Sequence, residues 1–348
     1  MKKVLILLTF ITLFSCKEEK LEQKTAFTKI ETKTILSDSI SIRALAIKND
    51  TVWYAGNKGK YGAICLTNNT KFKGHIVYDS LKPEFRSIAL SKNKVFVLSV
   101  GSPALLYAIS KNKTKTELTY TLEHPNAFFD SMLFVNDSTG LAMGDPLNDE
   151  LTVIKSIDFG KNWKQTKPNK NLRVTKGEAA FAASNTNLIK TENKVFMVSG
   201  GVQSRVFVSD DLGENWTAYP TPIIQGKAMT GIFTAAFYDD EIGIIAGGNY
   251  EEPKYNSANK AITTDGGKTW EIIAPNEVFG YSSCVQFVPK SNGNGIVSVG
   301  ADGLFYSNNR GKRWEKLSDD AELYTIRFIN ENKAIAAGKN KIIAIDFL

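Results

Sequence analysis

The sequence Ser156-Ile-Asp158-Phe-Gly160-Lys-Asn162-Trp163 is the first of four related octapeptides that decide the fold of this chain. All four have a Ser or Thr, an Asp or Asn two residues later, then a Gly and a closing Trp. The other three copies occupy residues 209–216, 263–270 and 307–314. Each copy lies between two apolar runs that alternate with polar residues, which predicts a turn between paired β-strands.

The residue types of the octapeptide suit a tight turn. An Asp or Asn side-chain oxygen can accept backbone N–H bonds within the turn. The Gly can adopt a positive φ, and the Trp begins the returning strand with a large apolar surface. We therefore assign a structural role to the acidic or amide residue and the Trp of each copy: Asp158, Trp163, Asp211, Trp216, Asp265, Trp270, Asn309 and Trp314.

The octapeptide resembles the Asp-box, or BNR, repeat of sialidase-like β-propellers. Successive Trp residues of the four copies are 53, 54 and 44 residues apart. A period of about 40–50 residues that holds four short strands is typical of propeller blades. Seven apolar runs open successive repeat units, and we predict an all-β, seven-bladed propeller over residues 27–348. The runs begin at Arg43, Arg86, Asp130, Ala180, Phe233, Ser283 and Tyr324.

The last repeat unit ends at Leu348 after only three predicted strands. Residues 27–35 alternate between apolar and polar side chains but have no partner in the first unit. We expect them to pair as the outer strand of the last blade, which would close the ring and cover a free sheet edge.

The N-terminus has the features of a targeting segment. Two lysines precede an apolar run of 11 residues, Val4 to Phe14, which is too short to span a bilayer. The following Leu13-Phe14-Ser15-Cys16 resembles a bacterial lipobox, which implies a signal peptide over residues 1–15 and lipidation of Cys16. We then expect residues 16–26 to form a tether and the protein to be an outer membrane lipoprotein. Lys17-Glu18-Glu19 resembles a surface-export signal but is equally a plain tether, so a periplasmic or cell-surface orientation stays open.

Composition argues against several classes of function. The formal charge is +7, but only 7 of the 43 basic residues are Arg and the lysines are scattered, so we expect no nucleic-acid partner. The only two histidines, His75 and His124, are too far apart to predict a metal site. No Gly-rich nucleotide loop is present, and we expect no cofactor. We expect a monomer in which Cys65 and Cys284 are free thiols.

Propeller geometry predicts which face binds a ligand. The four octapeptides should lie together on one face, and the openings of the units on the other. Long loops on a rigid scaffold tend to carry function. The resemblance extends to photosystem II assembly-factor-like (WD40/YVTN/BNR-like) propellers and implies a binding platform for a protein partner; a glycan is the other ligand class we expect. The candidate ligand-binding residues on that face are Arg43, Arg86, Arg205, Asn249, Tyr250 and Glu251.

The alternative is a glycoside-active enzyme, either a sialidase-like hydrolase or a lyase. Such enzymes use carboxylates, and sialidases add a Tyr nucleophile. Against this, Phe85-Arg86-Ser-Ile88 lacks the Pro of the sialidase F/Y-R-I-P motif. The candidate catalytic residues on the same face are Asp130, Asp145, Glu178 and Tyr250.

Overall fold

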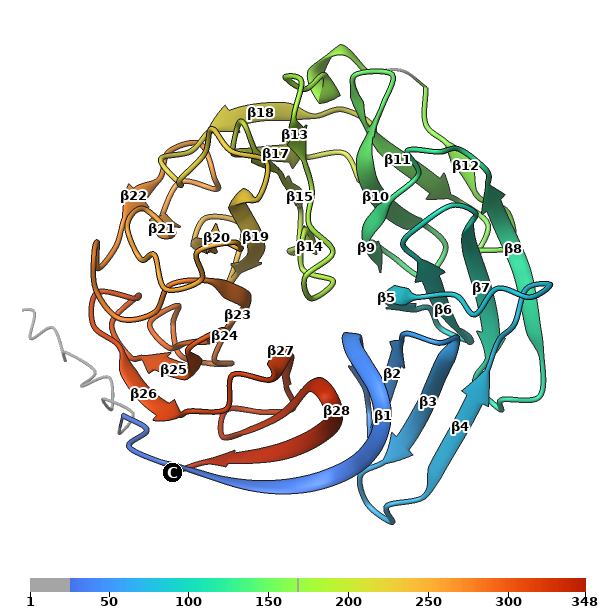
Figure 1. Cartoon of the computed structure of the whole chain (residues 1–348), viewed down its shortest axis with the longest axis horizontal. Helices are drawn as coiled ribbons and strands as arrows, with labels where there is room; N and C mark the ends of the chain where they lie inside the picture. The colour runs from blue at the N-terminus through green and yellow to red at the C-terminus, as the bar shows by residue number, and fades with distance from the viewer. Residues whose placement is uncertain (1–25, 168) are drawn as a thin grey trace, which may run out of the picture.

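The computed structural model describes residues 26–167 and 169–348. In this part of the chain the secondary structure is β-strands and one short 3-10 helix, η1 (Lys170–Leu172). The sheets are arranged as a ring around a common axis (Figure 1), which confirms the all-β propeller. The predicted signal peptide, Cys16 and most of the tether lie outside the described residues. Within the described residues, no helix is long and apolar enough to cross a membrane.

The strands form six hydrogen-bonded sheets, so the structure has six blades and the prediction of seven is wrong. Four of the sheets contain four antiparallel strands each. The first is β5 (Phe85–Leu90), β6 (Lys94–Ser99), β7 (Ala104–Ser110) and β8 (Thr116–Leu122). The second is β9 (Phe129–Phe134), β10 (Gly140–Leu147), β11 (Glu150–Ser156) and β12 (Lys164–Gln165). The third is β14 (Leu188–Lys190), β15 (Val195–Val198), β17 (Arg205–Ser209) and β18 (Thr217–Pro220). The fourth is β23 (Ser282–Phe287), β24 (Ile296–Gly300), β25 (Gly303–Ser307) and β26 (Glu315–Ser318).

One long strand joins the first and last repeat units into a single sheet, which is why the count of seven fails. β1 (Ile30–Lys48) is 19 residues long. Its first part pairs with the last strand, from Ile30 opposite Phe347 to Ser37 opposite Lys341. Its second part pairs with the second strand of the first unit. The expected pairing of the N-terminal segment with the C-terminal strand is therefore present, but within a continuous six-stranded sheet. That sheet is β27 (Leu323–Phe328), β28 (Lys333–Phe347), β1, β2 (Thr51–Gly56), β3 (Lys60–Cys65) and β4 (Lys71–His75).

The fourth repeat unit also differs from the sequence prediction. The apolar run at residues 180–184 forms no strand, and the inner strand of this unit is the three-residue β14 instead. The two-residue strands that precede β14 and follow β15 join the next sheet. That sheet is β13 (Glu178–Ala179), β16 (Gly200–Gly201), β19 (Thr230–Phe237), β20 (Gly243–Asn249), β21 (Lys260–Thr263) and β22 (Glu271–Ile272).

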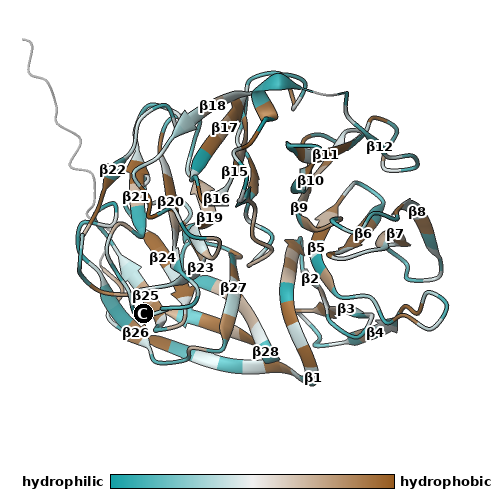
Figure 2. Cartoon of the chain, turned by 45° about the horizontal axis from the view of Figure 1, so that its top comes forward, coloured by the Kyte–Doolittle hydropathy of each residue, from teal (hydrophilic) through white to brown (hydrophobic). Residues whose placement is uncertain are grey.

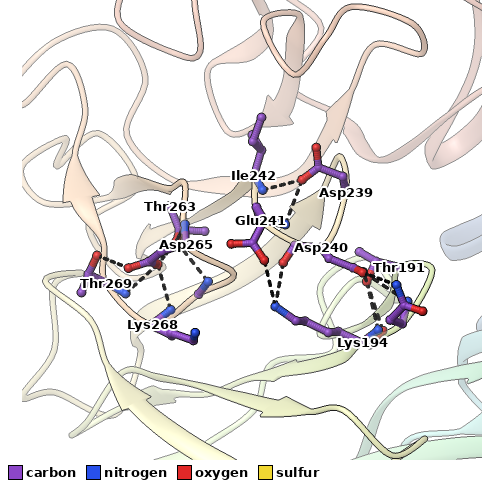
Figure 3. A network of polar contacts seen from close by, with 12 residues as sticks. Thr191, Lys194, Asp239, Asp240, Glu241, Ile242, Thr263, Asp265, Lys268 and Thr269 are labelled. Atoms are coloured by element: carbon purple, nitrogen blue, oxygen red, sulfur yellow. Dashed lines mark hydrogen bonds and ion pairs between the residues drawn. The ribbon is translucent and has the colours of Figure 1, made fainter.

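The four octapeptides form the turns between the third and fourth strands of their units, as predicted. In the turn after β21, Asp265 accepts hydrogen bonds from the backbone N–H groups of Lys268 (3.1 Å) and Thr269 (3.0 Å) and from the Thr263 hydroxyl (2.7 Å) (Figure 3). The adjacent turn at Asp240 and Glu241 binds Lys194 from the neighbouring unit. The glycine of each octapeptide has a positive φ, from 75° to 85°.

The tryptophans of the octapeptides pack between neighbouring units. The Trp163 ring lies 6.0 Å from the ring of Phe96 on β6 of the preceding unit and 5.9 Å from Phe134. Trp163 is 5% exposed and Trp216 is 2% exposed, so both belong to the core. Figure 2 shows hydrophobic residues along the strands and hydrophilic residues in many turns at the rim. The octapeptides therefore have a structural role in the ring.

Candidate functional site

Six inner strands carry a β-bulge at the same position, near the end of the unit that lies opposite the octapeptides. At each bulge the register with the second strand shifts by one residue, and one extra residue stands on the inner strand. Bulges re-aim a side chain and are frequent next to binding sites. The extra residues are Arg43, Arg86, Asp130, Phe233, Ser283 and Tyr324.

These six residues are the first residues of the runs by which the sequence defines its units. In five of the six units, the residue of the second strand that pairs beside the bulge is a Gly. A Cβ on Gly300 would lie 2.2 Å from the carbonyl oxygen of Tyr281, and a Cβ on Gly56 would lie 2.3 Å from that of Ser41. The bulge brings the inner backbone so close that only Gly fits there.

Residues 180–187 cross the centre of the ring, and we call this segment the plug. Its backbone and side chains bond to inner strands on several sides of the axis. Asn185 donates to the carbonyl of Ile88 on β5 (2.8 Å) and accepts from the backbone N–H of Met132 on β9 (2.9 Å). The Ser184 carbonyl accepts from Arg327 on β27 (2.9 Å), and the Thr186 and Thr234 hydroxyls are 2.8 Å apart. The plug explains why the fourth unit lacks a full inner strand, because these residues bond to the other units.

Two adjoining cavities lie above the plug, and we call them together the mouth. One has a volume of about 350 Å³ and the other about 310 Å³. Both are lined by Arg43, Tyr250 and Tyr281, so these side chains stand between them. The larger cavity is also lined by Arg86, Phe128, Asp145, residues 179–183, Ala228, Met229 and Phe233. The smaller is also lined by Pro253, Ser283, Gly300, Ala301, Ala321, Leu323 and Tyr324.

Four aromatic rings form a cluster in the mouth, which we call the aromatic cluster. Phe181 of the plug stacks on Phe233 at 3.9 Å, and Phe233 makes an edge contact with Tyr281 at 4.9 Å. Tyr250 makes an edge contact with Tyr281 at 5.3 Å. Phe233 and Tyr281 are buried, but Tyr250 is 49% exposed. The cluster therefore presents one accessible ring on a packed aromatic base, an arrangement suited to an apolar or aromatic group of a ligand.

Both arginines of the mouth already form hydrogen bonds within the protein. Arg43 donates to the carbonyl of Ala183 in the plug (2.9 Å), and its guanidinium lies 4.3 Å from the centre of the Tyr324 ring. Arg86 bonds to Glu84 through two nitrogens, at 2.8 and 2.7 Å. The register of Arg43 and Arg86 on neighbouring inner strands is as predicted, but their charges are partly satisfied within the protein.

Two carboxyl groups, one lining the larger cavity and one buried near it, have few hydrogen-bond partners. Asp145 accepts one hydrogen bond, from the backbone N–H of Ala180 in the plug (3.0 Å). Burial raises the pKa of Asp145 to about 6, and that hydrogen bond opposes the effect. Asp130 is fully buried, and neither of its carboxyl oxygens has a hydrogen-bond partner in the described residues. Burial, and then the charge of Asp145, hold the pKa of Asp130 well above its ordinary value, while Arg86 lowers it.

Besides the buried Asp130, four of the predicted residues lie outside the mouth. Glu178 and Arg205 form a buried, bidentate ion pair, with Nε–Oε1 and Nη2–Oε2 distances of 2.8 and 2.9 Å. Asn249 is buried and donates to Glu252, while Glu251 donates its backbone N–H to Asn249. None of these four lines either cavity. The structure thus brings Arg43, Arg86, Asp145 and Tyr250 together and leaves the other ligand-binding candidates apart.

The four candidate catalytic residues are likewise divided. Asp145 and Tyr250 line the larger cavity, Asp130 has no contact with solvent, and Glu178 is held by Arg205. Glycoside hydrolysis usually needs two carboxyl groups that face each other across the substrate. The described residues also contain no group of three or more His, Cys, Asp or Glu side chains that could hold a metal ion. The geometry therefore favours binding in the mouth over hydrolysis there.

Comparison with known proteins agrees with the fold. Residues 261–271 match the family model described as BNR/Asp-box repeat. This stretch contains the third octapeptide, which is therefore a BNR/Asp-box repeat. The solved structure described as "YCF48 bound to D1 peptide", a photosystem II assembly factor, superposes with a TM-score of 0.66 over 92% of this chain and 96% of that one, at 14% identity. The WD40 repeats of RRP9 superpose with a TM-score of 0.64 over 93% and 99%, at 11% identity.

A curated relative matches a smaller part of the sequence. The vacuolar protein sorting/targeting protein 10 of Pyrenophora teres f. teres (strain 0-1) is 30% identical over 121 residues, which is 35% of this chain. The match takes in 7% of that relative's length. The resemblance to BNR/Asp-box and assembly-factor-like propellers is confirmed, and the low identities to solved structures show the fold alone.

Sequence reasoning missed the plug and most of the aromatic cluster. The signal for Phe233 was present, because it begins its run at the position of Arg43 and Arg86 and a small residue follows it. No sequence pattern indicated the plug, because residues 180–184 resemble the apolar runs that open the other units. Only the contacts with other inner strands show that residues 180–187 are not a strand.

Proposed function

We propose that the protein is a binding platform that holds a peptide segment of a protein partner in the mouth. The observation that carries this proposal is the pair of adjoining cavities with Tyr250 exposed between them. Each cavity is large enough for a side chain but not for a folded domain, and both open above a plugged ring axis. A partner would therefore present an exposed loop or terminus.

The fold supports a peptide ligand in a second way. The similar YCF48 propeller was solved bound to a D1 peptide, so a propeller of this shape can hold a peptide. The mouth also combines a rigid inner wall of bulged strands with the loop that follows β20. Rigid scaffolds that carry such loops are common binding sites.

The test is selection of a random linear-peptide phage library on the purified protein, followed by affinity measurement of the selected peptides. Tyr250→Ala should weaken binding by about tenfold or more, because it removes the exposed ring of the aromatic cluster. Tyr255→Ala is the matched control: Tyr255 follows β20 in the same loop and is 45% exposed, but it lines neither cavity. Equal losses in both variants, or no loss in either, would contradict the proposal.

A glycan remains the second ligand class we consider, because Asp145 and the exposed Tyr250 ring share one cavity and sugars stack on such rings. A glycan array and a panel of chromogenic glycosides distinguish the possibilities. Binding of a glycan that depends on Tyr250 would replace the peptide proposal, and turnover lost in Asp145→Asn would support the glycoside-active alternative.

We further propose that lipidated Cys16 anchors the protein in the outer membrane, facing the periplasm or the cell surface. The support is the sequence Leu13-Phe14-Ser15-Cys16. The first described residues lie beside the C-terminus, where the Thr28 N–H donates to the Leu348 carbonyl (2.9 Å). Metabolic labelling with a fatty-acid analogue should tag the wild type but not Cys16→Ala, and labelling of the variant would refute the anchor.

A further inference from the structure

The carboxyl groups at the Asp145 side of the mouth lack a cation. Within residues 26–167 and 169–348, neither Asp130 nor Asp145 forms a salt bridge, and Asp130 has no hydrogen-bond partner for either oxygen. A buried polar group without a partner costs stability and is rare in folded proteins. Asp145, the one of the two that lines the larger cavity, is therefore a candidate contact for a ligand.

The two nearby arginines bond to other groups of the protein. Arg86, which is within electrostatic reach of Asp130, gives two of its nitrogens to Glu84. Arg43 bonds to the plug and lies over Tyr324. The larger cavity is lined by Asp145 and by no lysine. The Asp145 carboxylate is thus left without a cationic partner among the described residues, although both arginines line the same cavity.

Aromatic walls surround the same half. Phe128 and Phe181 line the larger cavity together with Asp145, and Phe181 stacks on Phe233. A cation beside a carboxylate gains a charge-assisted hydrogen bond, and a cation over a ring face gains a further attraction. An uncharged apolar group could pack against the rings, but it would make neither of these interactions and would desolvate Asp145 without giving it a partner.

We propose that the Asp145 side of the mouth is a subsite for a cationic group, the ammonium of a lysine or the guanidinium of an arginine carried by the bound peptide. This inference rests on the proposed peptide-binding function and specifies the partner: a segment with a basic side chain next to an apolar or aromatic one. The basic group binds at Asp145, and the apolar group binds on the aromatic cluster.

The subsite should respond to pH. The pKa of Asp145 lies at about 6 in the free protein, and a bound cation stabilises the ionised carboxylate. Affinity for a basic peptide should therefore fall below about pH 6, up to tenfold per pH unit when one proton is coupled to binding. Arg43, Arg86 and Glu84 are the other charged groups around the cavity, and Asp130 is the other titratable group near it.

The experiment uses four synthetic peptides that differ at one central position between two phenylalanines: lysine, arginine, norleucine or glutamate. Their affinities for the full chain are measured by calorimetry at pH 7.5 and pH 5. Asp145→Asn removes the charge but keeps an oxygen that can accept the Ala180 N–H. Asp149→Asn is the matched control, because Asp149 is exposed in the turn after β10 and lines neither cavity.

We expect the lysine and arginine peptides to bind the wild type on the order of tenfold more tightly than the norleucine peptide. The preference should vanish in Asp145→Asn, persist in Asp149→Asn and shrink at pH 5 in the wild type. Equal binding of the lysine and norleucine peptides would overturn the cationic subsite and leave the peptide platform standing. Failure of all four peptides and of the phage library would overturn both. The pH dependence in the wild type decides the question if Asp145→Asn does not fold.

Discussion

Asp211 and Asp210 are neighbours in the second octapeptide, and the structure predicts opposite consequences of replacing them with alanine. The Asp211 carboxylate accepts from the backbone N–H groups of Glu214 (3.1 Å) and Asn215 (2.8 Å), from the Asn215 amide (2.8 Å) and from the Ser209 hydroxyl (2.8 Å). Asp210 is exposed, and no side-chain bond is found for it among the described residues. Both substitutions remove one negative charge, so Asp210→Ala is a matched control.

Asp211→Ala leaves two backbone donors of the turn without their protein partner. Loss of a comparable capping side chain costs about 0.5–2 kcal/mol, and we expect the free energy of unfolding to fall by about 1–2 kcal/mol. Asp210→Ala should change it by no more than about 0.5 kcal/mol. Denaturant unfolding followed by tryptophan fluorescence gives both values, and Tm should fall by a few degrees only for Asp211→Ala.

The difference between the two variants should depend on pH in a defined direction. Partial burial alone raises the pKa of Asp211, but the hydrogen bonds from Asn215, Ser209 and Glu214 outweigh it and hold the pKa below its usual value. The stabilisation is therefore complete above the unfolded-state pKa of about 3.9 and is lost as the pH falls through the lower folded-state pKa. Equal stabilities at pH 7, or a difference that grows on acidification, would refute the structural role of Asp211.

Three further predictions concern the ring. Deleting residues 26–37 removes the part of β1 that pairs with β28 and should cause aggregation through the freed edge; a monomer with unchanged Tm would contradict this. Gly300→Ala should cost about 1–3 kcal/mol, because its Cβ would meet the Tyr281 carbonyl at 2.2 Å, whereas Gly101→Ala, with nothing within 4 Å, should be neutral in denaturant unfolding. Asn185→Ala should cost about 2–3 kcal/mol in the same assay through its lost bonds to β5 and β9; a neutral result would show that the plug is not held as described.

The sequence predicts the turns well because their chemistry is local. The bonds of Asp158 reach only from Ser156 to Asn162, so eight residues contain the whole arrangement. The opening runs are equally readable, since each bulge residue is the first residue of its run. Arg43 and Arg86 could therefore be placed in one mouth from spacing alone.

The blade count and the contents of the mouth depend on contacts that no local pattern records. β1 continues without a break from its pairing with β28 to its pairing with β2, and nothing in its alternation shows that two units share it. Residues 180–184 have the composition of an inner strand but bond across the ring axis. Glu178 and Arg205 looked like ligand-binding or catalytic residues, yet each satisfies the other.

Hydrogen–deuterium exchange with and without a selected phage peptide tests the central claim most directly. The account predicts that bound peptide slows amide exchange in the mouth, in residues 228–231, 249–253 and 279–283, and leaves the four octapeptide turns unchanged. Protection confined to residues 156–163, 209–216, 263–270 or 307–314 would contradict it, because the binding face would then be the one that carries the BNR/Asp-box turns.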